Sequence, residues 1–330
     1  VKMALARQAA GARFAARPSA RRVVAVRAST ATAPAAADLQ KKFGIKGSVE
    51  VKPGNANSTK VVLTHHSGSS AEIYLHGACV TSWKQPSGDE VLYVRPDAVF
   101  DKSKPISGGI PHCFPQFGPG KMQQHGFARN LDWAVSATSA NPNPDEPEPT
   151  VELVLTESEY TTKMWPHKFK AVYTVTLQAE QLRTHLRVIN TDDKDFDFTA
   201  ALHTYIEVLH IGQAKVKGLK GLTYLDKGKD PKNPETKVES RDAITFDAYM
   251  DSVYLNAPDH VQLDVGTGAA VAITSSGWQD TVVWNPWHTM KDCYERFVCV
   301  ENAKFGSPAV VKPGQSWEAT ATFSVEELSA

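Results

Sequence analysis

The 330-residue chain has no apolar run of about 18 residues, the length that a membrane-spanning helix requires. We therefore expect no membrane partner. The chain also lacks the GxGxxG and GxxxxGK[ST] patterns, the GxSxG of serine hydrolases and the HExxH of zinc proteases. These absences argue against nucleotide cofactors, phosphate-loop chemistry and lipase-type serine catalysis, so we expect neither a cofactor nor a metal.

Cysteine is scarce, with four residues in the whole chain: Cys79, Cys113, Cys293 and Cys299. They form no CxxC pair and show no zinc-binding spacing. We expect free, largely buried thiols in a reducing compartment. A redox-regulated pair stays open as an alternative.

Acidic side chains are absent from residues 1–37, which carry seven basic ones. An Arg-rich, acid-poor leader is typical of an organelle transit peptide, and Val26-Arg27-Ala28-Ser29 resembles a chloroplast processing site. A mitochondrial leader and a nucleic-acid-binding arm are the alternatives, although the arginines are spaced rather than clustered. The rest of the chain has 29 basic and 36 acidic residues, which argues against a nucleic-acid partner. We expect a disordered chloroplast leader at 1–37 and one monomeric domain at 38–330.

Short β-type runs separated by Gly, Pro, Ser and Asp turns fill that domain after a helix-like stretch at Asp38–Phe43. The runs Ala171–Leu177 and Leu182–Ile189 alternate apolar and polar residues, and the four residues between them predict a hairpin. No long segment has helical periodicity. The pattern predicts an all-β, antiparallel sandwich or barrel.

Two stretches break this pattern. Residues 141–149 (NPNPDEPEP) form a Pro-rich acidic segment that reads as an exposed insertion. Residues 95–127 are rich in Gly and Pro and show few strand signals. A long irregular loop within a compact domain is uncommon and usually functional.

His203 lies in a predicted strand at 195–208. Apolar residues occupy one face of this strand, and His203 shares the more polar face with Thr199 and Tyr205. A histidine there can donate a proton near neutral pH. Taken alone, the strand favours the alternative of a surface histidine without a catalytic role.

Glu301 closes a predicted strand, Arg296–Glu301, and shares its face with Phe297 and Cys299. Apolar neighbours raise the pKa of a carboxyl group towards the range of a useful base, although a strand-end salt bridge fits equally well. Arg129 suits a phosphate or sugar hydroxyls, or an ion pair with Asp132. Five tryptophans offer either sugar-stacking faces or core packing: Trp133, Trp165, Trp278, Trp284 and Trp287.

Five motifs occur together in one order: Gly108–Gly118 (GGIPHCFPQFG), Gln124–Arg129 (QHGFAR), Leu202–Tyr205 (LHTY), Asp280–Trp287 (DTVVWNPW) and Val300–Asn302 (VEN). With them, the sequence from about residue 48 to 327 resembles the glucose-6-phosphate 1-epimerases, or hexose-6-phosphate mutarotases, of the aldose 1-epimerase superfamily. Plant relatives of this group are often labelled apospory-associated protein C. The resemblance implies a galactose-mutarotase-like antiparallel β-supersandwich that binds a sugar or sugar phosphate without a cofactor.

The resemblance also implies residue roles. His203 would be the general acid and Glu301 the general base. His125 would bind near the ring oxygen, and Arg129 would contact the phosphate or adjacent hydroxyls. Gln124 and Asp280 match site-lining positions.

One position departs from the family pattern. Many phosphate-using members carry an arginine before Gly-Gly-Ile-Pro, where this chain has Ser107. That arginine is expected to grip the 6-phosphate. The basic residues Arg95, Lys102 and Lys104 of the same loop are candidates to replace it, with solvated loop charges as the alternative.

Three rival functions remain at this stage. The first is epimerisation of an unphosphorylated aldose. The second is a non-catalytic carbohydrate-binding module or subunit of a complex. The third is a sandwich-fold glycoside hydrolase or lyase, for which Asp197 or Glu207 would have to face Glu301.

Overall fold

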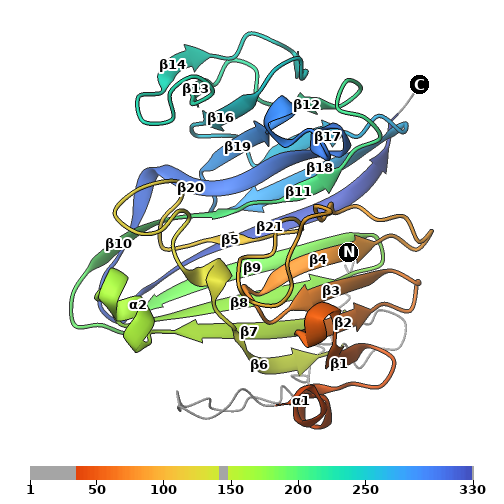
Figure 1. Cartoon of the computed structure of the whole chain (residues 1–330), viewed down its shortest axis with the longest axis vertical. Coiled ribbons are helices and arrows are strands. Elements are labelled where there is room, and N and C mark those ends of the chain that lie inside the picture. Colours follow the sequence, from red (N-terminus) through yellow and green to blue (C-terminus); the bar gives the residue numbers. More distant parts are fainter. Residues whose placement is uncertain (1–34, 141–147, 329–330) are drawn as a thin grey trace, which may run out of the picture.

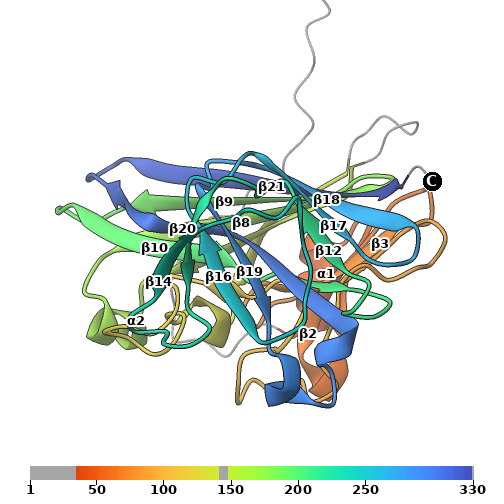
Figure 2. The ribbon, with the colours of Figure 1, turned by 90° about the horizontal axis from the view of Figure 1, so that it is seen from above.

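A computed structural model describes residues 35–140 and 148–328. Strands make up nearly all of the regular structure, and every strand ladder pairs antiparallel, which confirms the expected all-β class. The strands form three sheets, which can be followed in Figures 1 and 2. The predicted leader at 1–34 and most of the acidic segment, 141–147, lie outside the described residues. Within the described ranges, no helix is long and apolar enough to cross a membrane.

A four-stranded sheet comes first in the chain. Its strands pair in sequence order: β1 (Val49–Pro53), β2 (Thr59–Thr64), β3 (Ser70–Tyr74) and β4 (Cys79–Lys84). Before it lies helix α1 (Ala36–Phe43), which begins two residues earlier than predicted and buries Leu39 and Phe43 in the core. The expected leader boundary after residue 37 therefore falls inside this helix.

The second sheet has nine strands. In spatial order they are β15 (Ala243–Ile244), β12 (Lys215–Lys217), β17 (His260–Asp264), β18 (Ala269–Ser276), β21 (Ser316–Glu327), β9 (Gln181–Asn190), β8 (Phe169–Leu177), β7 (Thr150–Thr156) and β6 (Ala134–Ser139). The predicted hairpin is present, because β8 pairs with β9 from Leu177↔Leu182 to Phe169↔Asn190. Its inward side chains, such as Tyr173 and Leu186, are buried.

The third sheet carries Glu301, and His203 lies between two of its strands. Its order is β14 (Glu235–Val238), β13 (Thr223–Asp226), β16 (Met250–Tyr254), β19 (Asp280–Asn285), β20 (Phe297–Val311), β10 (Phe196–Leu202) and β5 (His112–Cys113), with β11 (Tyr205–Glu207) also paired to β20. The expected strand at 195–208 is interrupted at His203 and Thr204, because the Thr204 N–H donates back to the Leu202 carbonyl. Glu301 lies inside the long strand β20 and not at a strand end.

Short helices connect several of the strands. The α-helix α2 (Glu159–Met164) and four 3-10 helices, η1 (Asn55–Asn57), η2 (Ala128–Asn130), η3 (Trp287–Met290) and η4 (Tyr294–Arg296), connect the strands. One hydrophobic cluster runs from Leu39 to Phe323 and includes side chains of all three sheets. Trp133, Trp165 and Trp278 belong to it, so they are core residues and not sugar-stacking faces.

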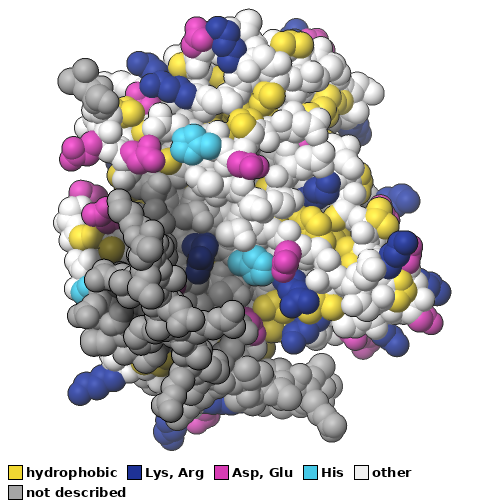
Figure 3. All heavy atoms as spheres, turned by 180° about the vertical axis from the view of Figure 1, so that it is seen from behind, with side chains coloured by type: hydrophobic (Ala, Val, Ile, Leu, Met, Phe, Trp, Pro, Cys, Tyr) yellow, Lys and Arg dark blue, Asp and Glu magenta, His cyan; other side chains and the backbone are white. Residues whose placement is uncertain are grey.

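The rear surface mixes both signs of charge. Lysine and arginine side chains alternate with aspartate and glutamate over the coloured part of that face (Figure 3). No large single-sign field is visible there among the described residues, and such a field is what would draw in a polyanion.

Candidate active site

His203 and Glu301 face each other across two neighbouring strands. In the ladder of β10 and β20, Leu202 pairs with Asn302, and the Val300 N–H then donates to the Thr204 carbonyl. This register places residue 203 opposite residue 301, where side chains point to the same side of the sheet. The Nδ1 atom of His203 lies 3.4 Å from Oε1 of Glu301.

Both side chains are almost fully buried, which contradicts the alternative of a surface histidine. His203 is 8% exposed and Glu301 is 2% exposed. Nevertheless, Nδ1 of His203 and Oε2 of Glu301 have no hydrogen-bond partner among the described residues. Buried polar atoms are nearly always bonded, so these two atoms are free to bond a ligand.

Burial opposes charge on both members of the pair. Desolvation, followed by the positive charge of Arg129, lowers the pKa of His203 to about 3. Desolvation, followed by the negative charge of Asp251, raises the pKa of Glu301 well above its usual range. Burial therefore favours the state in which both side chains are neutral, with the transferable proton of the pair on the carboxyl group of Glu301. Such a pair can move a proton between two atoms of a substrate.

His125 adds a second imidazole to the site. Its ring is perpendicular to that of His203, with the ring centroids 5.6 Å apart. The Gly118 N–H donates to Nδ1 of His125 over 3.1 Å, so the proton of the neutral ring is on Nε2. Burial is the first cause that lowers the pKa of His125, to about 2, and so this ring is a neutral donor.

The backbone conformation at Gly126 fixes the position of the loop that carries His125. Gly126 has φ +70°, and a Cβ at this position would lie 2.2 Å from the Phe114 carbonyl oxygen. The Phe114 N–H donates to the His125 carbonyl, and the Phe127 N–H donates back to Phe114. Only glycine fits so close an approach at a positive φ. The predicted functional loop at 95–127 thus delivers His125 to the pair.

Arg129 and Gln124 lie at the edge of the same loop. The Arg129 Nη2 group donates to the Gln124 carbonyl oxygen over 3.0 Å, and its Nε has no partner among the described residues. The alternative ion pair with Asp132 is not formed, because Asp132 instead binds Lys102 and His76. The Arg129 charge lowers the pKa of His203 and of Glu301, so it acts on both members of the pair. The Gln124 side chain is exposed beside the His125 ring.

Asp280 is placed differently from its expected role. Its Oδ1 accepts the Asn256 N–H, and its Oδ2 accepts the N–H groups of Phe305 and Gly306. It is 3% exposed. A carboxylate with three backbone donors anchors the main chain around β20, and it has little capacity left for a sugar.

Three residues that the sequence did not single out as catalytic or binding groups adjoin the pair. Tyr205 stacks on the His203 ring with centroids 4.8 Å apart. On the other side, Lys227 and Asp251 are brought together by the pairing of β13 with β16. Trp284, named above as a possible stacking face, meets the His203 ring edge-on at 5.4 Å and is only partly buried.

The carboxylates required by a glycoside hydrolase are not in place. Asp197 is exposed, and Glu207 forms an ion pair with Arg296 over 2.6 Å. Neither therefore faces Glu301. Within the described ranges, no three His, Cys, Asp or Glu side chains gather in a way that would hold a metal ion.

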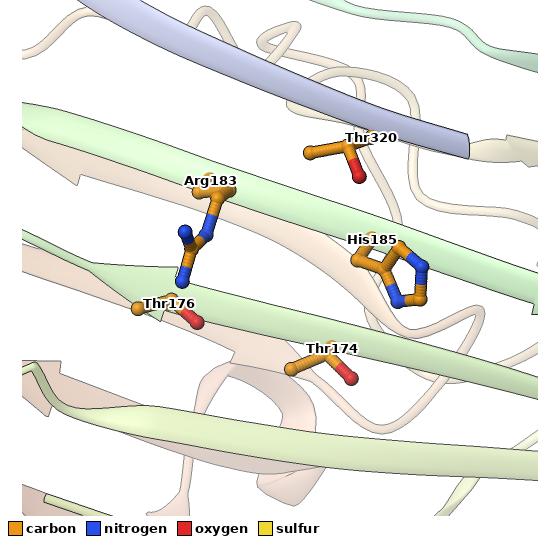
Figure 4. A pocket seen from close by; sticks show the side chains of 5 residues that line it. All are labelled: Thr174, Thr176, Arg183, His185 and Thr320. Carbon is orange, nitrogen blue, oxygen red and sulfur yellow. The ribbon is translucent and has the colours of Figure 1, made fainter. Parts of the chain in front are cut away.

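A separate hollow lies on the nine-stranded sheet. Thr174 and Thr176 of β8, Arg183 and His185 of β9, and Thr320 of β21 line it (Figure 4). None of these side chains is a carboxylate, so the hollow lacks the base that the pair supplies.

Comparison with known proteins agrees with this geometry. Residues 59–324 match the family "Aldose 1-epimerase". A "putative glucose-6-phosphate 1-epimerase" of Cenchrus ciliaris is 40% identical over 273 residues, 78% of this chain and 82% of the relative. A protein of the same description from Escherichia coli K12 is 35% identical over 74% of this chain and 82% of its own length.

Solved structures extend the likeness to the fold. A "putative mutarotase" of Salmonella typhimurium superposes with a TM-score of 0.77 at 28% identity, covering 86% of this chain and 96% of the other. Galactose 1-epimerase of Lactobacillus acidophilus shares the fold alone, with a TM-score of 0.63 at 14% identity over 83% of this chain and 96% of its own. The matched family spans well over half of the sequence, and the fold agrees with it. The chain therefore belongs to the aldose 1-epimerase family.

Proposed function

We propose that this epimerase interconverts the α and β anomers of a hexose 6-phosphate, with D-glucose 6-phosphate as the first candidate. The observation that carries the proposal is the opposed pair of His203 and Glu301, 3.4 Å apart, each with an unpartnered buried atom. The names of the relatives from Cenchrus ciliaris and Escherichia coli support the phosphate ester as substrate.

The reaction needs only the transfer of protons. Glu301 takes the proton of the C1 hydroxyl while His203 gives a proton to the ring oxygen. The bond between C1 and the ring oxygen breaks, and C1 becomes an aldehyde. Rotation about C1–C2 presents the other face of the aldehyde, and the reverse transfers close the ring. His125 Nε2–H and Arg129 are suited to hold the sugar oxygens during this rotation.

Arg95 is the best placed of the three cations that could replace the family arginine at Ser107. The Arg95 N–H donates to the Ser107 carbonyl over 3.0 Å, beside the bridge between Val94 and Gly108, so the two residues lie opposite each other. Lys102 is bound to Asp132 instead. The Arg95 charge lowers the pKa of Tyr205, whose ring covers His203.

The present partner of Arg95 is replaceable. Its Nε and Nη2 bond the two carboxylate oxygens of Asp97 over 2.9 and 2.6 Å. The Asp97 side chain is 64% exposed, and exposed ion pairs contribute about 0–1 kcal/mol. A phosphate dianion offers the same forked geometry with more charge. We therefore infer that the substrate phosphate displaces Asp97 from Arg95.

The full chain should accelerate conversion of freshly dissolved α-glucose 6-phosphate into the β anomer. The measurement couples the reaction to an excess of a β-selective dehydrogenase, with free glucose and free galactose in parallel. A preference for the ester supports the proposal. Acceleration of the free sugars alone would assign an ordinary aldose epimerase, and no acceleration of any sugar would favour a binding module.

Replacing Arg95 with Met should raise KM for the phosphate ester about ten- to a hundredfold, because a charge-assisted hydrogen bond is lost. KM for free glucose should change little. Lys102→Met is the matched control, since it removes a cation of the same loop that is bound to Asp132. Equal KM changes for ester and free sugar in Arg95→Met would exclude Arg95 as the residue that binds the phosphate.

We also propose that residues 1–37 direct the protein to the chloroplast, with the mitochondrion as alternative. The seven basic residues without an acidic one support this proposal. Because α1 begins at Ala36, processing near Ser29 would leave the helix whole. Fusion of residues 1–37 to a fluorescent reporter tests it, and a reporter that stays in the cytosol would contradict it.

A further inference from the structure

Lys227 is a buried cation beside the catalytic pair. It follows β13, and its N–H donates to the Asp251 carbonyl of β16 over 2.8 Å, so the main chain fixes its position. Only 7% of the residue is exposed. Lysine is rarely so deeply buried unless its charge is compensated.

The ammonium group of Lys227 has two aromatic faces and one ion-pair partner beside it, but it makes no close hydrogen bond among the described residues. It lies 5.4 Å from the ring centroid of Phe117 and 6.0 Å from that of Phe305. The carboxylate nearest to it in an ion pair is Asp251, whose Oδ2 is 3.8 Å away, beyond hydrogen-bonding distance. A buried charge without close hydrogen bonds costs stability, so its presence calls for a role.

Lys227 lies next to residues that adjoin Glu301 on one side and His125 on the other. Phe305 is four residues beyond Glu301 on β20, and it packs against a cluster that includes Val282, the residue paired with Glu301. On the other side, a Cβ built on Gly118 would lie 3.9 Å from the Lys227 Nζ. Gly118 is the residue whose N–H orients the His125 ring.

We propose that Lys227 is a positioning residue of the epimerase, whose buried positive charge holds Glu301 in the ionised form that acts as the base. This inference rests on the proposed roles of Glu301 and His203. Lys227 itself need not touch the reacting atoms.

The charges that act on Glu301 have opposite signs. Lys227 and Arg129 lower its pKa, whereas burial and the Asp251 carboxylate raise it. Other titratable groups on neighbouring elements are His203 between β10 and β11, Tyr205 on β11, Cys113 on β5 and Cys299 on β20 itself. Asp280 of the paired strand β19 bonds three backbone N–H groups instead. Both thiols and the phenol have raised pKa values, so they are neutral near pH 7. Lys227 and Arg129 are thus the cations that favour the carboxylate.

Replacing Lys227 with Met should move the acidic limb of the kcat/KM profile of the full chain to higher pH. The base is active only above its pKa, and loss of a nearby positive charge raises that pKa, so the expected shift is about one pH unit upwards. Lys229→Met is the matched control, because the Lys229 side chain is 81% exposed and pairs with Glu235 over 3.5 Å. Its limb should coincide with that of the wild type.

A second substitution should shift the acidic limb in the opposite direction. Asp251→Asn removes a negative charge that raises the pKa of Glu301, so its acidic limb should move to lower pH. Lys227→Arg should restore the wild-type limb, and Lys227→Gln replaces Lys227→Met if the latter does not fold. An unmoved limb in a folded Lys227→Met or Lys227→Gln variant overturns the inference but leaves the proposed function intact. A Glu301→Gln variant that keeps the wild-type activity and limb instead overturns the proposed roles themselves.

Discussion

Replacing Glu301 with Gln should reduce kcat for anomer exchange by about 10²–10⁴-fold, the usual contribution of a general base. Glutamine keeps the size of the side chain and leaves the backbone pairing of β20 unchanged, but it cannot accept the proton of the C1 hydroxyl. Because the proposed mechanism places Glu301 at the reacting atoms, kcat should fall far more than KM rises. The dehydrogenase-coupled assay with α-glucose 6-phosphate measures both parameters.

The thermal stability of the Glu301→Gln variant is the control that shows whether it is folded. Burial raises the pKa of Glu301 in the folded protein, so its stabilising effect is complete below the unfolded pKa and is lost as pH rises towards the folded pKa. The Gln variant lacks this loss and should melt at the same or a higher temperature at pH 8. Glu207→Gln, on adjoining β11, is the matched variant that should retain activity. Near-normal turnover in a folded Glu301→Gln protein would remove Glu301 from the mechanism.

The sequence predicts most of the β structure because half-buried strands alternate apolar and polar residues. The hairpin of β8 and β9 follows from such alternation. The break at His203 could not be foreseen, since alternation continues without change through β10, Thr204 and β11. Helix α2 was also missed, because six residues are too few to show a helical period, although Ser158 and Thr161 form its capping box.

The candidate site shows what local pattern cannot supply. His203 and Glu301 were singled out from strand position and family resemblance, but their opposition depends on the register between β10 and β20. Lys227 and Asp251 gave no sequence signal, because only the pairing of β13 with β16 brings them together. Asp280 matched a substrate-binding position in the sequence, but in the structure its carboxylate bonds three backbone N–H groups. The sequence pattern cannot distinguish these two roles of a carboxylate on a strand.

Replacing His203 with Gln should also reduce kcat by about 10²–10⁴-fold, because the ring oxygen then lacks a proton donor as it leaves C1. The sharper expectation concerns the double variant with Glu301→Gln. The two side chains lie 3.4 Å apart and are proposed to act in one proton transfer, so either single substitution should interrupt the same step. Residues that act as such a unit are not additive, and the double variant should be about as slow as the slower single one.

The double-mutant cycle separates a shared proton from two independent contributions. Multiplicative losses in kcat would mean that His203 and Glu301 each act alone and would contradict their action in one proton transfer. Tyr205→Phe is the control, because it keeps the ring that stacks on His203 and removes only a hydroxyl group. Its losses should simply multiply with those of Glu301→Gln, since the Tyr205 hydroxyl carries no part of the transferred proton. Non-additivity confined to His203 and Glu301 would then identify these two side chains as the proton-transfer unit of the site.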